Sequence, residues 1–336
     1  MWIMKIKPNK TKKLLFALFF LVNVSCFSQT IYNVILEQIA AGNVNKPEAI
    51  AFDGNGLMYT ANEDGRIIVL NRNGSNPQDY AQTGGRPLGL KFDSQGNLIV
   101  ADAFQGLLSI DTTGQITVLS TSFAGVPFML TDDLDIGSDG TIYFSDASYL
   151  NNINNISNDW GQPNGRLLSY NPNTNITSLL LDNLYFANGV ALSQDETFVL
   201  VNETFEHRIM QYWLKGPKAG AAEVFAENLP GYIDNITEAE DGGFWLAVVA
   251  ARRDDVDNLV DKPFLRKVVW RVTQATGGSL VTMHSYAVKL DKDGKLLKSL
   301  EDDSGHIYMM TSVLEHKGKL YLGSLLNDGI GIIDAP

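Results

Sequence analysis

Hydrophobic and polar positions form short runs along almost the whole chain, with Asp, Asn and Gly between the runs. The runs are rich in Val, Ile, Leu, Phe and Tyr, which is typical of β-strands bounded by turns. No long stretch has apolar residues at the spacing of an amphipathic helix, which is about 3.6 residues. The pattern therefore predicts an all-β protein.

The runs recur as a repeat of two strands joined by a polar turn. In each copy an apolar strand leads into a turn such as Asp53–Gly56, and a second apolar strand such as Leu57–Thr60 follows. The six copies begin at Ile50, Leu90, Leu134, Val190, Ile236 and Val313. A unit of about 40 to 50 residues is the signature of a propeller blade. Further strands bring each unit to about four, so the sequence predicts a six-bladed β-propeller with four antiparallel strands in each blade.

The spacing of the units indicates where loops and ring closure occur. Successive copies start 40, 44, 56, 46 and 77 residues apart, and the last interval contains an insertion around residues 250–267 that is rich in Arg and Asp. Loops of this size commonly cover a mouth or pocket. The end segments Ile31–Leu36 and Gly329–Ile333 are predicted to pair and close the ring, which protects their open edges. Residues 29–336 then form one propeller domain.

The first 28 residues are typical of an export signal. Five lysines between Lys5 and Lys13 precede an apolar run, Leu14–Val24, that is too short for a membrane-spanning helix of about 20 residues. We therefore expect a signal peptide at 1–28, no transmembrane segment in the mature chain, and a periplasmic or secreted product. Cys26, the only cysteine, leaves a lipoprotein as an alternative, but Asn23 stands where such signals prefer an aliphatic side chain.

Charge and composition narrow the class of partner. Hydrophobic residues make up 45% of the chain and charged residues 19%, which is the composition of a globular protein with a sizeable core. Without the five lysines of the signal, 21 basic residues face 38 acidic ones, so the mature net charge is −17. Such a field repels DNA and RNA, and no basic run offsets it. The expected partner is a small-molecule substrate and not a nucleic acid.

One position of the repeat carries candidate chemistry. The innermost strand of every propeller blade starts at the same end of the central channel, so equivalent residues face one another there. Two residues before each copy stand Glu48, Leu88, Asp132, Asn188, Asp234 and Thr311, which we call the channel column. Asp and Asn are favoured in turns before strands, but this preference does not account for Glu48 or for three carboxylates. Three converging carboxylates repel one another unless a cation lies between them.

The donor atoms of the channel column indicate which cation this is. Hard oxygen ligands without His or Cys are typical of Ca²⁺, which takes about 6 to 8 oxygens, and not of Zn²⁺. Asn235, next to Asp234, offers a further amide oxygen. The sequence therefore predicts a Ca²⁺ site in the central channel.

Longer segments of the chain carry a family resemblance. They are Arg86–Leu90 (RPLGL), Phe186–Ser193 (FANGVALS), Tyr212–Gly220 (YWLKGPKAG), Glu227–Ile236 (ENLPGYIDNI) and Gly318–Leu325 (GKLYLGSL). These segments resemble the strictosidine synthase-like family, which is related to the arylesterases (paraoxonases) and to the gluconolactonase group. The resemblance covers nearly all of the mature chain and implies a six-bladed propeller with Ca²⁺ in its channel. The ligand positions that it implies are Glu48, Asp132, Asn188, Asp234 and Asn235.

The chain also departs from these relatives. The family often has Asn where Asp132 stands, and the extra charge should tighten Ca²⁺ binding. Ala49 stands where the arylesterases carry an acid that helps to bind a second, structural metal, although Asp133 remains. The alkaloid-forming members condense an amine with an aldehyde by means of a Glu that Thr311 replaces, and threonine cannot act as that base. The arylesterases place a catalytic His where Leu88 stands, so a histidine mechanism is not supported either.

The function that remains is Ca²⁺-dependent hydrolysis of a lactone, ester or phosphotriester. The metal would polarise the carbonyl or phosphoryl group, and Asp234 is the candidate catalytic residue, either as general base or as nucleophile. Phe186, Trp245, Arg252 and Arg253 are candidate substrate contacts at the mouth, although Phe186 and Trp245 fit the core of a strand equally well. The alternative function is a non-catalytic binding propeller in which Ca²⁺ only ties the blades together.

Overall fold

The computed structural model describes residues 30–253, 285–302 and 305–336, with a few positions between 259 and 272. The predicted signal peptide at 1–28, its Cys26 and most of the predicted insertion at 250–267 lie outside the described residues. In the part of the chain that is described, no helix is long and apolar enough to cross a membrane.

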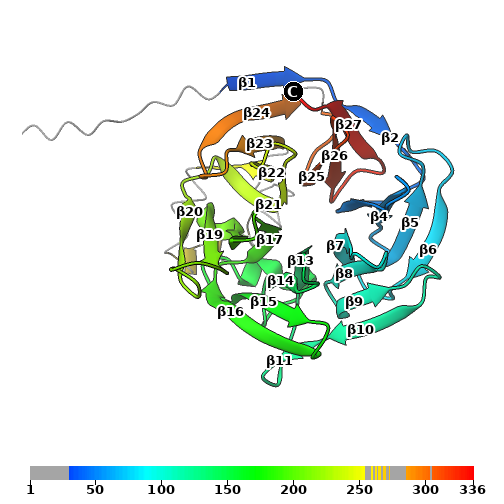
Figure 1. The fold of residues 1–336 in the computed structure, drawn as a ribbon. Helices are drawn as coiled ribbons and strands as arrows, with labels where there is room; N and C mark the ends of the chain where they lie inside the picture. Colours follow the sequence, from blue (N-terminus) through cyan, green and yellow to red (C-terminus); the bar gives the residue numbers. More distant parts are fainter. Residues whose placement is uncertain are drawn as a thin grey trace, which may run out of the picture.

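Six sheets of strands surround a central axis, as Figure 1 shows. The first blade consists of β3 (Ile50–Phe52), β4 (Met58–Ala61), β5 (Arg66–Leu70) and β6 (Gln78–Gln82), and the second of β7 (Pro87–Phe92), β8 (Leu98–Asp102), β9 (Gly106–Ile110) and β10 (Ile116–Ser120). The third consists of β13 (Thr131–Ile136), β14 (Ile142–Asp146), β15 (Gly165–Asn171) and β16 (Ile176–Leu184), and the fourth of β17 (Ala187–Leu192), β18 (Phe198–Glu203), β19 (Arg208–Trp213) and β20 (Ala222–Ala226).

The last two blades include strands from the start of the chain. The fifth consists of β21 (Gly231–Glu238), β22 (Phe244–Ala251), β23 (Tyr286–Leu290), β24 (Leu296–Asp302) and β1 (Thr30–Val34). The sixth consists of β25 (Met310–His316), β26 (Lys319–Ser324), β27 (Ile330–Asp334) and β2 (Glu37–Ile39). Smaller elements are the hairpin of β11 (Ser122–Phe123) and β12 (Val126–Pro127) and the short 3₁₀ helices η1 (Ile153–Asn158) and η2 (Thr204–Glu206). The predicted six-bladed, all-β propeller is confirmed.

An N-terminal strand pairs with the C-terminal strand and closes the ring, as predicted, but a different N-terminal segment does so. β2 pairs antiparallel with β27, with Gln38 opposite Gly331, and so completes the sixth blade. The segment expected to do this forms β1 instead, which pairs in parallel with the outer edge of β24, with Tyr32 opposite Leu300. The two pairings cover the edges of two adjacent blades with one N-terminal segment, and an uncovered edge would be open to other chains.

The hydrophobic core lies between neighbouring blades. Between the first and second blades, Tyr59 and Ile67 pack against Leu90, Val100 and Leu108, and all five side chains are buried. Strand β8 is buried along its whole length because it lies in the middle of its sheet, whereas the outer strand β10 is partly exposed. Full burial of an aliphatic side chain contributes about 1.5 to 3 kcal/mol, so these interfaces hold the ring together.

The repeated turn after each innermost strand has a common backbone shape. Gly56, Gly96 and Gly140 have φ angles of 84°, 86° and 84°, which glycine adopts without a steric cost. The fourth copy has Glu196 at this place, with a φ of 51°. Its carboxylate accepts hydrogen bonds from the backbone N–H and the hydroxyl of Ser138 in the third blade, at 2.6 and 2.9 Å. These bonds compensate for the less favourable backbone conformation.

Candidate functional site

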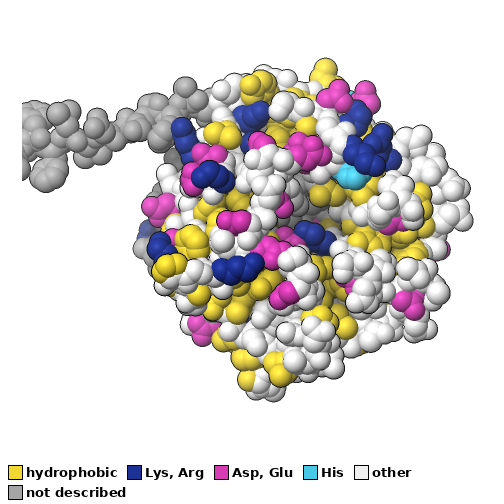
Figure 2. Space-filling model, in the orientation of Figure 1, with side chains coloured by type: hydrophobic (Ala, Val, Ile, Leu, Met, Phe, Trp, Pro, Cys, Tyr) yellow, Lys and Arg dark blue, Asp and Glu magenta, His cyan; other side chains and the backbone are white. Residues whose placement is uncertain are grey.

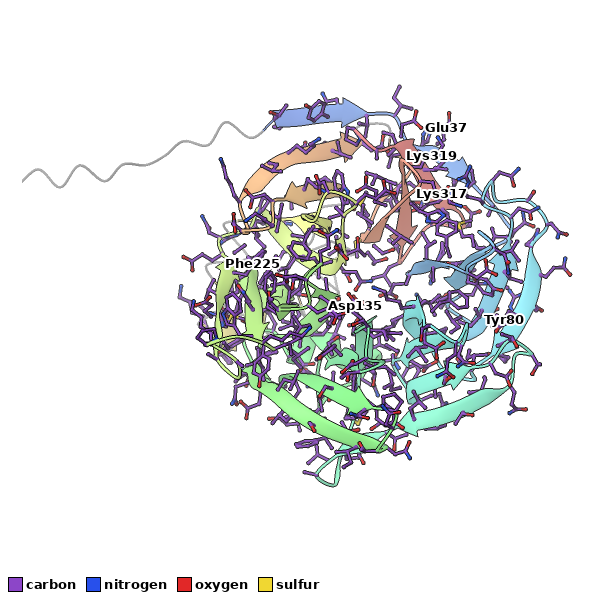
Figure 3. The ribbon with its side chains drawn as sticks, viewed as in Figure 1. Glu37, Tyr80, Asp135, Phe225, Lys317 and Lys319 are labelled. Carbon is purple, nitrogen blue, oxygen red and sulfur yellow. The ribbon has the colours of Figure 1, made fainter. Side chains whose placement is uncertain are left out.

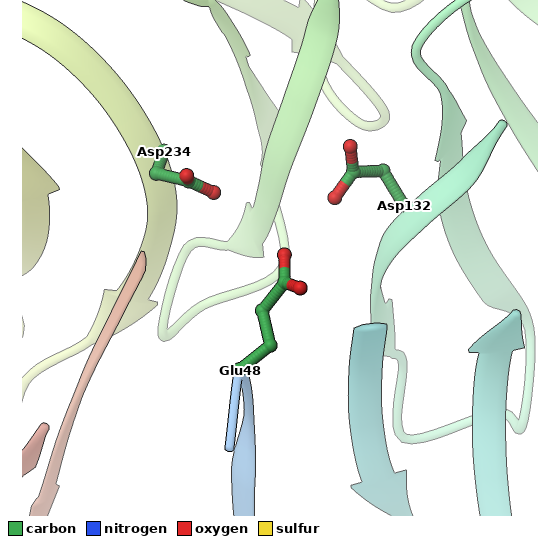
Figure 4. Close-up of side chains that lie close together, drawn as sticks. All are labelled: Glu48, Asp132 and Asp234. Atoms are coloured by element: carbon green, nitrogen blue, oxygen red, sulfur yellow. The ribbon is translucent and has the colours of Figure 1, made fainter. Parts of the chain in front are cut away.

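Three carboxylates of the channel column meet in the central channel. Carboxylate oxygens of Glu48, Asp132 and Asp234 all lie within 4.8 Å of one another. They come from the segment before β3, from β13 and from β21, and Figure 4 shows the three side chains pointing toward one another. The repeat alignment predicted this meeting from positions that are far apart in the sequence.

Local irregularities in the strands direct these side chains into the channel. The pairing of β13 with β14 shifts register between Thr131 and Leu134, around Asp132, and the pairing of β21 with β22 shifts between Ile233 and Ile236, around Asp234. The second, fourth and sixth blades shift at the same place. A β-bulge bends its strand and turns the side chains there in new directions, so the bulges place the column residues of these five blades, whereas Glu48 lies before the first strand of its blade.

Buried polar groups of the second strands hold these bulges. The amide of Asn202 on β18 donates to the carbonyl of Asp234. The hydroxyl of Ser145 on β14 accepts from the backbone N–H of Asp133 at 3.0 Å. Asn202 and Ser145 are fully buried, so their hydrogen bonds are protected from competition with water.

The channel column and the neighbouring Asn235 also contain oxygen atoms that no described protein group satisfies. The Oδ1 atoms of Asp132, Asn188, Asp234 and Asn235 are buried and have no hydrogen-bond partner among the described residues. Burial raises the pKa of Asp132 well above its usual range, and the charges of Glu48 and Asp234 raise it further. Burial and the charge of Glu48 likewise raise the pKa of Asp234. Such groups are normally satisfied in folded proteins, so this donor set fits a hard cation such as Ca²⁺.

Arg86 supports Glu48, and the sequence analysis assigned it no role. Its Nη2 atom donates to Oε2 of Glu48 at 3.1 Å and to the carbonyl oxygen of Lys46 at 3.2 Å. Both side chains of the ion pair are buried. Burial raises the pKa of Glu48, and the Arg86 guanidinium opposes that rise. Arg86 stands two residues before Leu88, in a copy of the repeat whose column position carries no acid. A basic residue so close to the column was the one feature of the sequence that could have indicated its contact with Glu48.

The two column positions without a carboxylate or amide have other roles. Leu88 is buried and lines the cavity described below. The Thr311 hydroxyl donates to the carbonyl oxygen of Glu48 at 3.0 Å, and the Ser312 hydroxyl donates to the same atom at 2.6 Å. Thr311 therefore fixes the backbone of Glu48 across the seam between the sixth and first blades.

A cavity of about 360 Å³ opens on one side of the channel column, and we call it the apolar cavity. Its polar lining is mainly Glu48, Asp132, Asn188 and Asp234, with Ser157 and Thr204. The rest of the wall is apolar or aromatic: Leu88, Leu130, Ile153, Ile156, Trp160, Phe186, Phe205, Tyr232, Val249, Met309 and Leu325. Four of these, Leu130, Phe186, Tyr232 and Met309, stand two residues before a column position, at or just before the start of an innermost strand.

The proposed mouth residues separate into two groups. Phe186 lines the apolar cavity, with its ring centroid 4.9 Å from that of Phe205, and its φ of 63° is unusual for a bulky residue. Trp245 is buried between the fifth and sixth blades instead, where its indole N–H donates to Glu315 at 2.9 Å. Arg252 donates to Asn228 at 2.8 Å, and neither it nor Arg253 lines the cavity.

A second cavity of about 310 Å³ lies on the other side of the channel column, and we call it the polar cavity. It is lined by residues that follow the column positions, including Ala49, Asp133 and Asn235. Lys91 and Asp135 form an ion pair there, and Figure 3 shows Asp135 near the central axis. Figure 2 shows acidic and basic side chains gathered around the hollow of this face. The two neighbours Asp234 and Asn235 thus line different cavities.

Comparisons with known proteins identify relatives along most of the chain. The family described as strictosidine synthase matches residues 132–217, and the family described as strictosidine synthase-like, N-terminal, matches residues 35–70. The Arabidopsis thaliana protein STRICTOSIDINE SYNTHASE-LIKE 6 is 37% identical over 307 residues, which cover 89% of this chain and 81% of the relative. The adipocyte plasma membrane-associated protein of Rattus norvegicus is 35% identical over 317 residues, which cover 86% and 83%.

Solved structures share the fold at lower identity. A gluconolactonase from Xanthomonas campestris has a TM-score of 0.66 and 15% identity, with 89% of each chain covered. Regucalcin from Agrobacterium tumefaciens, described as a calcium-binding protein, has a TM-score of 0.65 and 14% identity, with 90% of this chain and 95% of that chain covered. At these identities the likeness bears on the fold alone.

Proposed function

We propose that this chain, which belongs to the strictosidine synthase-like family, is a Ca²⁺-dependent hydrolase of a lactone, ester or phosphotriester. The observation that supports the proposal most is the set of buried, unpartnered oxygens beside three converging carboxylates. Glu48, Asp132, Asn188 and Asp234 would hold the ion, with Asn235 as a further amide ligand. The bound ion would supply a positive charge that polarises the carbonyl or phosphoryl group of the substrate.

Asp234 is the proposed catalytic residue. The described residues that line the apolar cavity include no histidine, lysine or arginine, so carboxylates are the groups available to accept a proton there. Asp234 either takes a proton from the attacking water or attacks the carbonyl carbon or phosphorus itself. In the second case the bond to the alcohol or phenol oxygen breaks, and water then cleaves the acyl or phosphoryl intermediate and regenerates the carboxylate. A carboxylate that is ionised as a metal ligand is a weak base, which favours the nucleophilic role.

A binding propeller is the second candidate. Leu88 and Thr311 occupy the column positions where relatives keep catalytic groups, and Thr311 is engaged by the backbone of Glu48. That contact also weighs against amine–aldehyde condensation at this site. In a binding propeller the ion would stabilise the ring and no substrate would turn over.

Activity and thermal unfolding distinguish the two candidates. The mature protein is assayed on aryl esters, lactones and phosphotriesters with added Ca²⁺, with a chelator, and after Ca²⁺ is restored. Asp234→Asn should abolish turnover, whereas Asp182→Asn, at an exposed position of β16, should not. Turnover that survives both the chelator and Asp234→Asn would contradict the proposed mechanism. A large calcium-dependent rise in the melting temperature without turnover on any substrate would favour the binding propeller.

Export is part of the same proposal. The basic and apolar segments of residues 1–28 support a signal peptide, and a mature charge of −17 supports a small-molecule partner over a nucleic acid. Fractionation of cells that express the full chain, with mass spectrometry of the N-terminus, tests this. A processed chain in the periplasm or medium is expected, and an intact chain in the cytoplasm would contradict it.

A further inference from the structure

One wall of the apolar cavity belongs to a single loop of the third blade. Residues 147–164 connect β14 to β15 and contain the 3₁₀ helix η1. Ile153, Ile156 and Trp160 of this loop all line the cavity. The loop thus places three large apolar side chains near the carboxylate cluster, although it adds no strand to the sheet of the third blade.

A buried carboxylate holds the loop in this arrangement. Asp159 is fully buried, and its Oδ1 atom accepts hydrogen bonds from the Ser148 hydroxyl at 2.9 Å and from the amides of Asn151 and Asn164 at 2.8 Å each. The backbone N–H of Tyr149 donates to the carbonyl of Asn164 at 3.0 Å and closes the base of the loop. A loop with this internal network is preorganised, so binding a ligand against it costs little ordering entropy.

Aromatic side chains of the fourth blade continue the wall. The ring of Trp160 lies 6.4 Å from the ring of Phe205, which in turn lies 4.9 Å from that of Phe186. Thr204, beside Phe205, donates its hydroxyl to the carbonyl of Ile233 at 2.8 Å, so that proton already has an acceptor. The charged side chains that line the cavity all belong to the channel column.

We propose that the apolar cavity binds a neutral ester or lactone with an apolar acyl or aryl group, and that the loop 147–164 supplies this selectivity. The inference rests on the proposed hydrolase function. The carbonyl would face the channel column, and the apolar group would contact Ile153, Ile156 and the aromatic wall. Hydrolysis adds water to the acyl carbon and breaks its bond to the ester oxygen, so that an ester releases a carboxylic acid and an alcohol or phenol and a lactone opens to a hydroxy acid.

The same wall would reject two kinds of substrate. The hydroxyl groups of a sugar lactone would lose their water against Ile153, Ile156 and Phe205, whose side chains offer no hydrogen bond. An anionic substrate would lose its hydration in a cavity whose charged lining residues are the carboxylates of Glu48, Asp132 and Asp234. Apolar neutral substrates meet neither penalty.

A series of nitrophenyl esters with growing acyl chains tests the selectivity, with decalactone and gluconolactone as a second pair. All are assayed on the calcium-loaded mature protein. We expect kcat/KM to rise about fourfold for each added methylene until the cavity is full. Decalactone should be hydrolysed and gluconolactone should not. A flat or falling series, or a preference for gluconolactone, would overturn the inference.

A pair of matched variants locates the effect in the loop. Ile156→Asp introduces a charge into the cavity wall at a position that is 37% exposed. Ile176→Asp introduces the same charge at a position of β16 that is 57% exposed and is not among the residues that line the cavity. The first should lower kcat/KM for the longest ester by about tenfold or more, since it places a charge beside an apolar group. The second should not, and equal effects would contradict the assignment.

Binding without turnover separates this inference from the hydrolase proposal. Alkyl phenyl ketones resemble the esters but cannot be hydrolysed, and their binding is measured by thermal shift with calcium present. If the ketones bind, bind more weakly to Ile156→Asp, and no ester is turned over, the cavity selects apolar ligands but the protein is not a hydrolase. If gluconolactone is turned over and the ketones do not bind, the protein is a hydrolase but the proposed selectivity for apolar ligands is wrong.

Discussion

The two cavities that meet at the channel column differ in how their polar groups are satisfied. In the apolar cavity, oxygen atoms of Asp132, Asn188 and Asp234 are buried without a partner among the described residues. In the polar cavity, Asp133 accepts from the backbone N–H of Val190 at 2.9 Å. The Asp133 carboxylate is therefore paired within the protein, whereas the unpartnered oxygens, including that of Asn235 in the polar cavity, are available to a bound group.

Adjacent residues show the contrast most directly. Asp132 and Asp133 are both buried, and burial is the largest cause that raises the pKa of each. Backbone N–H groups and the charge of Lys91 lower the pKa of Asp133 against the opposing charge of Asp135, which leaves it at about 7, whereas the charges near Asp132 are all carboxylates that raise its pKa further. A buried acid with backbone donors stabilises the fold, and a buried acid among other acids suits a cation. This difference indicates a structural role for one and a binding role for the other.

The largest expected effect comes from removing each acid in turn. Asp132→Ala should weaken Ca²⁺ binding by about 100-fold or more, since even the loss of a group that supports a metal ligand costs about 10- to 100-fold. Asp133→Ala should leave Ca²⁺ affinity within a few-fold but cost about 1 to 3 kcal/mol of stability, because the N–H of Val190 loses its acceptor. Isothermal titration with calcium and chemical unfolding in chelator measure the two effects. Equal losses of affinity would remove the distinction between the cavities.

The second comparison concerns two basic side chains, Arg86 beside Glu48 and Lys91 in the polar cavity. Arg86→Gln should weaken Ca²⁺ binding by about 10- to 100-fold, because Glu48 loses the donor that orients it. Lys91→Gln should leave Ca²⁺ binding nearly unchanged and lower stability by about 1 to 3 kcal/mol, because Asp135 loses its ion-pair partner. Arg86→Lys serves as the control that keeps the charge and should lie between Arg86→Gln and the unchanged protein. A Ca²⁺ affinity in Arg86→Gln equal to that of the unchanged protein would show that Glu48 needs no support.

The sequence predicted the channel column because the repeat gives every blade the same register. Once the six copies are aligned, the residues that face the channel follow from strand geometry, and Glu48, Asp132 and Asp234 meet accordingly. The alignment of the repeats does not show which cavity a residue next to a column position lines. Asn235 lies next to Asp234, yet it lines the polar cavity and not the apolar cavity. Its place as a ligand stays a prediction.

Loops and contacts between blades were harder to predict because they do not repeat. The interval of the third unit is 56 residues, which signals extra chain, but no periodicity shows that Trp160 faces the channel. The partnership of Arg86 with Glu48 joins two blades and depends on side-chain conformation. Trp245 was assigned to the mouth as one of two options, and the alternation of β22 instead turns it into the interface between blades. The pattern of apolar residues predicts where a strand lies, whereas the packing of neighbouring blades determines what each side chain contacts.

The smallest expected effect concerns Thr311, which touches the site through the backbone of Glu48 alone. Thr311→Val removes one of two hydroxyl donors to the Glu48 carbonyl and keeps the side-chain volume. Because Ser312 still donates there, we expect a loss of about 0.5 to 1.5 kcal/mol in stability. Ca²⁺ affinity should change by less than about threefold, since a loss of this size is well below that for a direct ligand. Thr311→Ser should behave as the unchanged protein. A tenfold loss of activity in Thr311→Val with unchanged stability would instead mean that the hydroxyl takes part in the reaction.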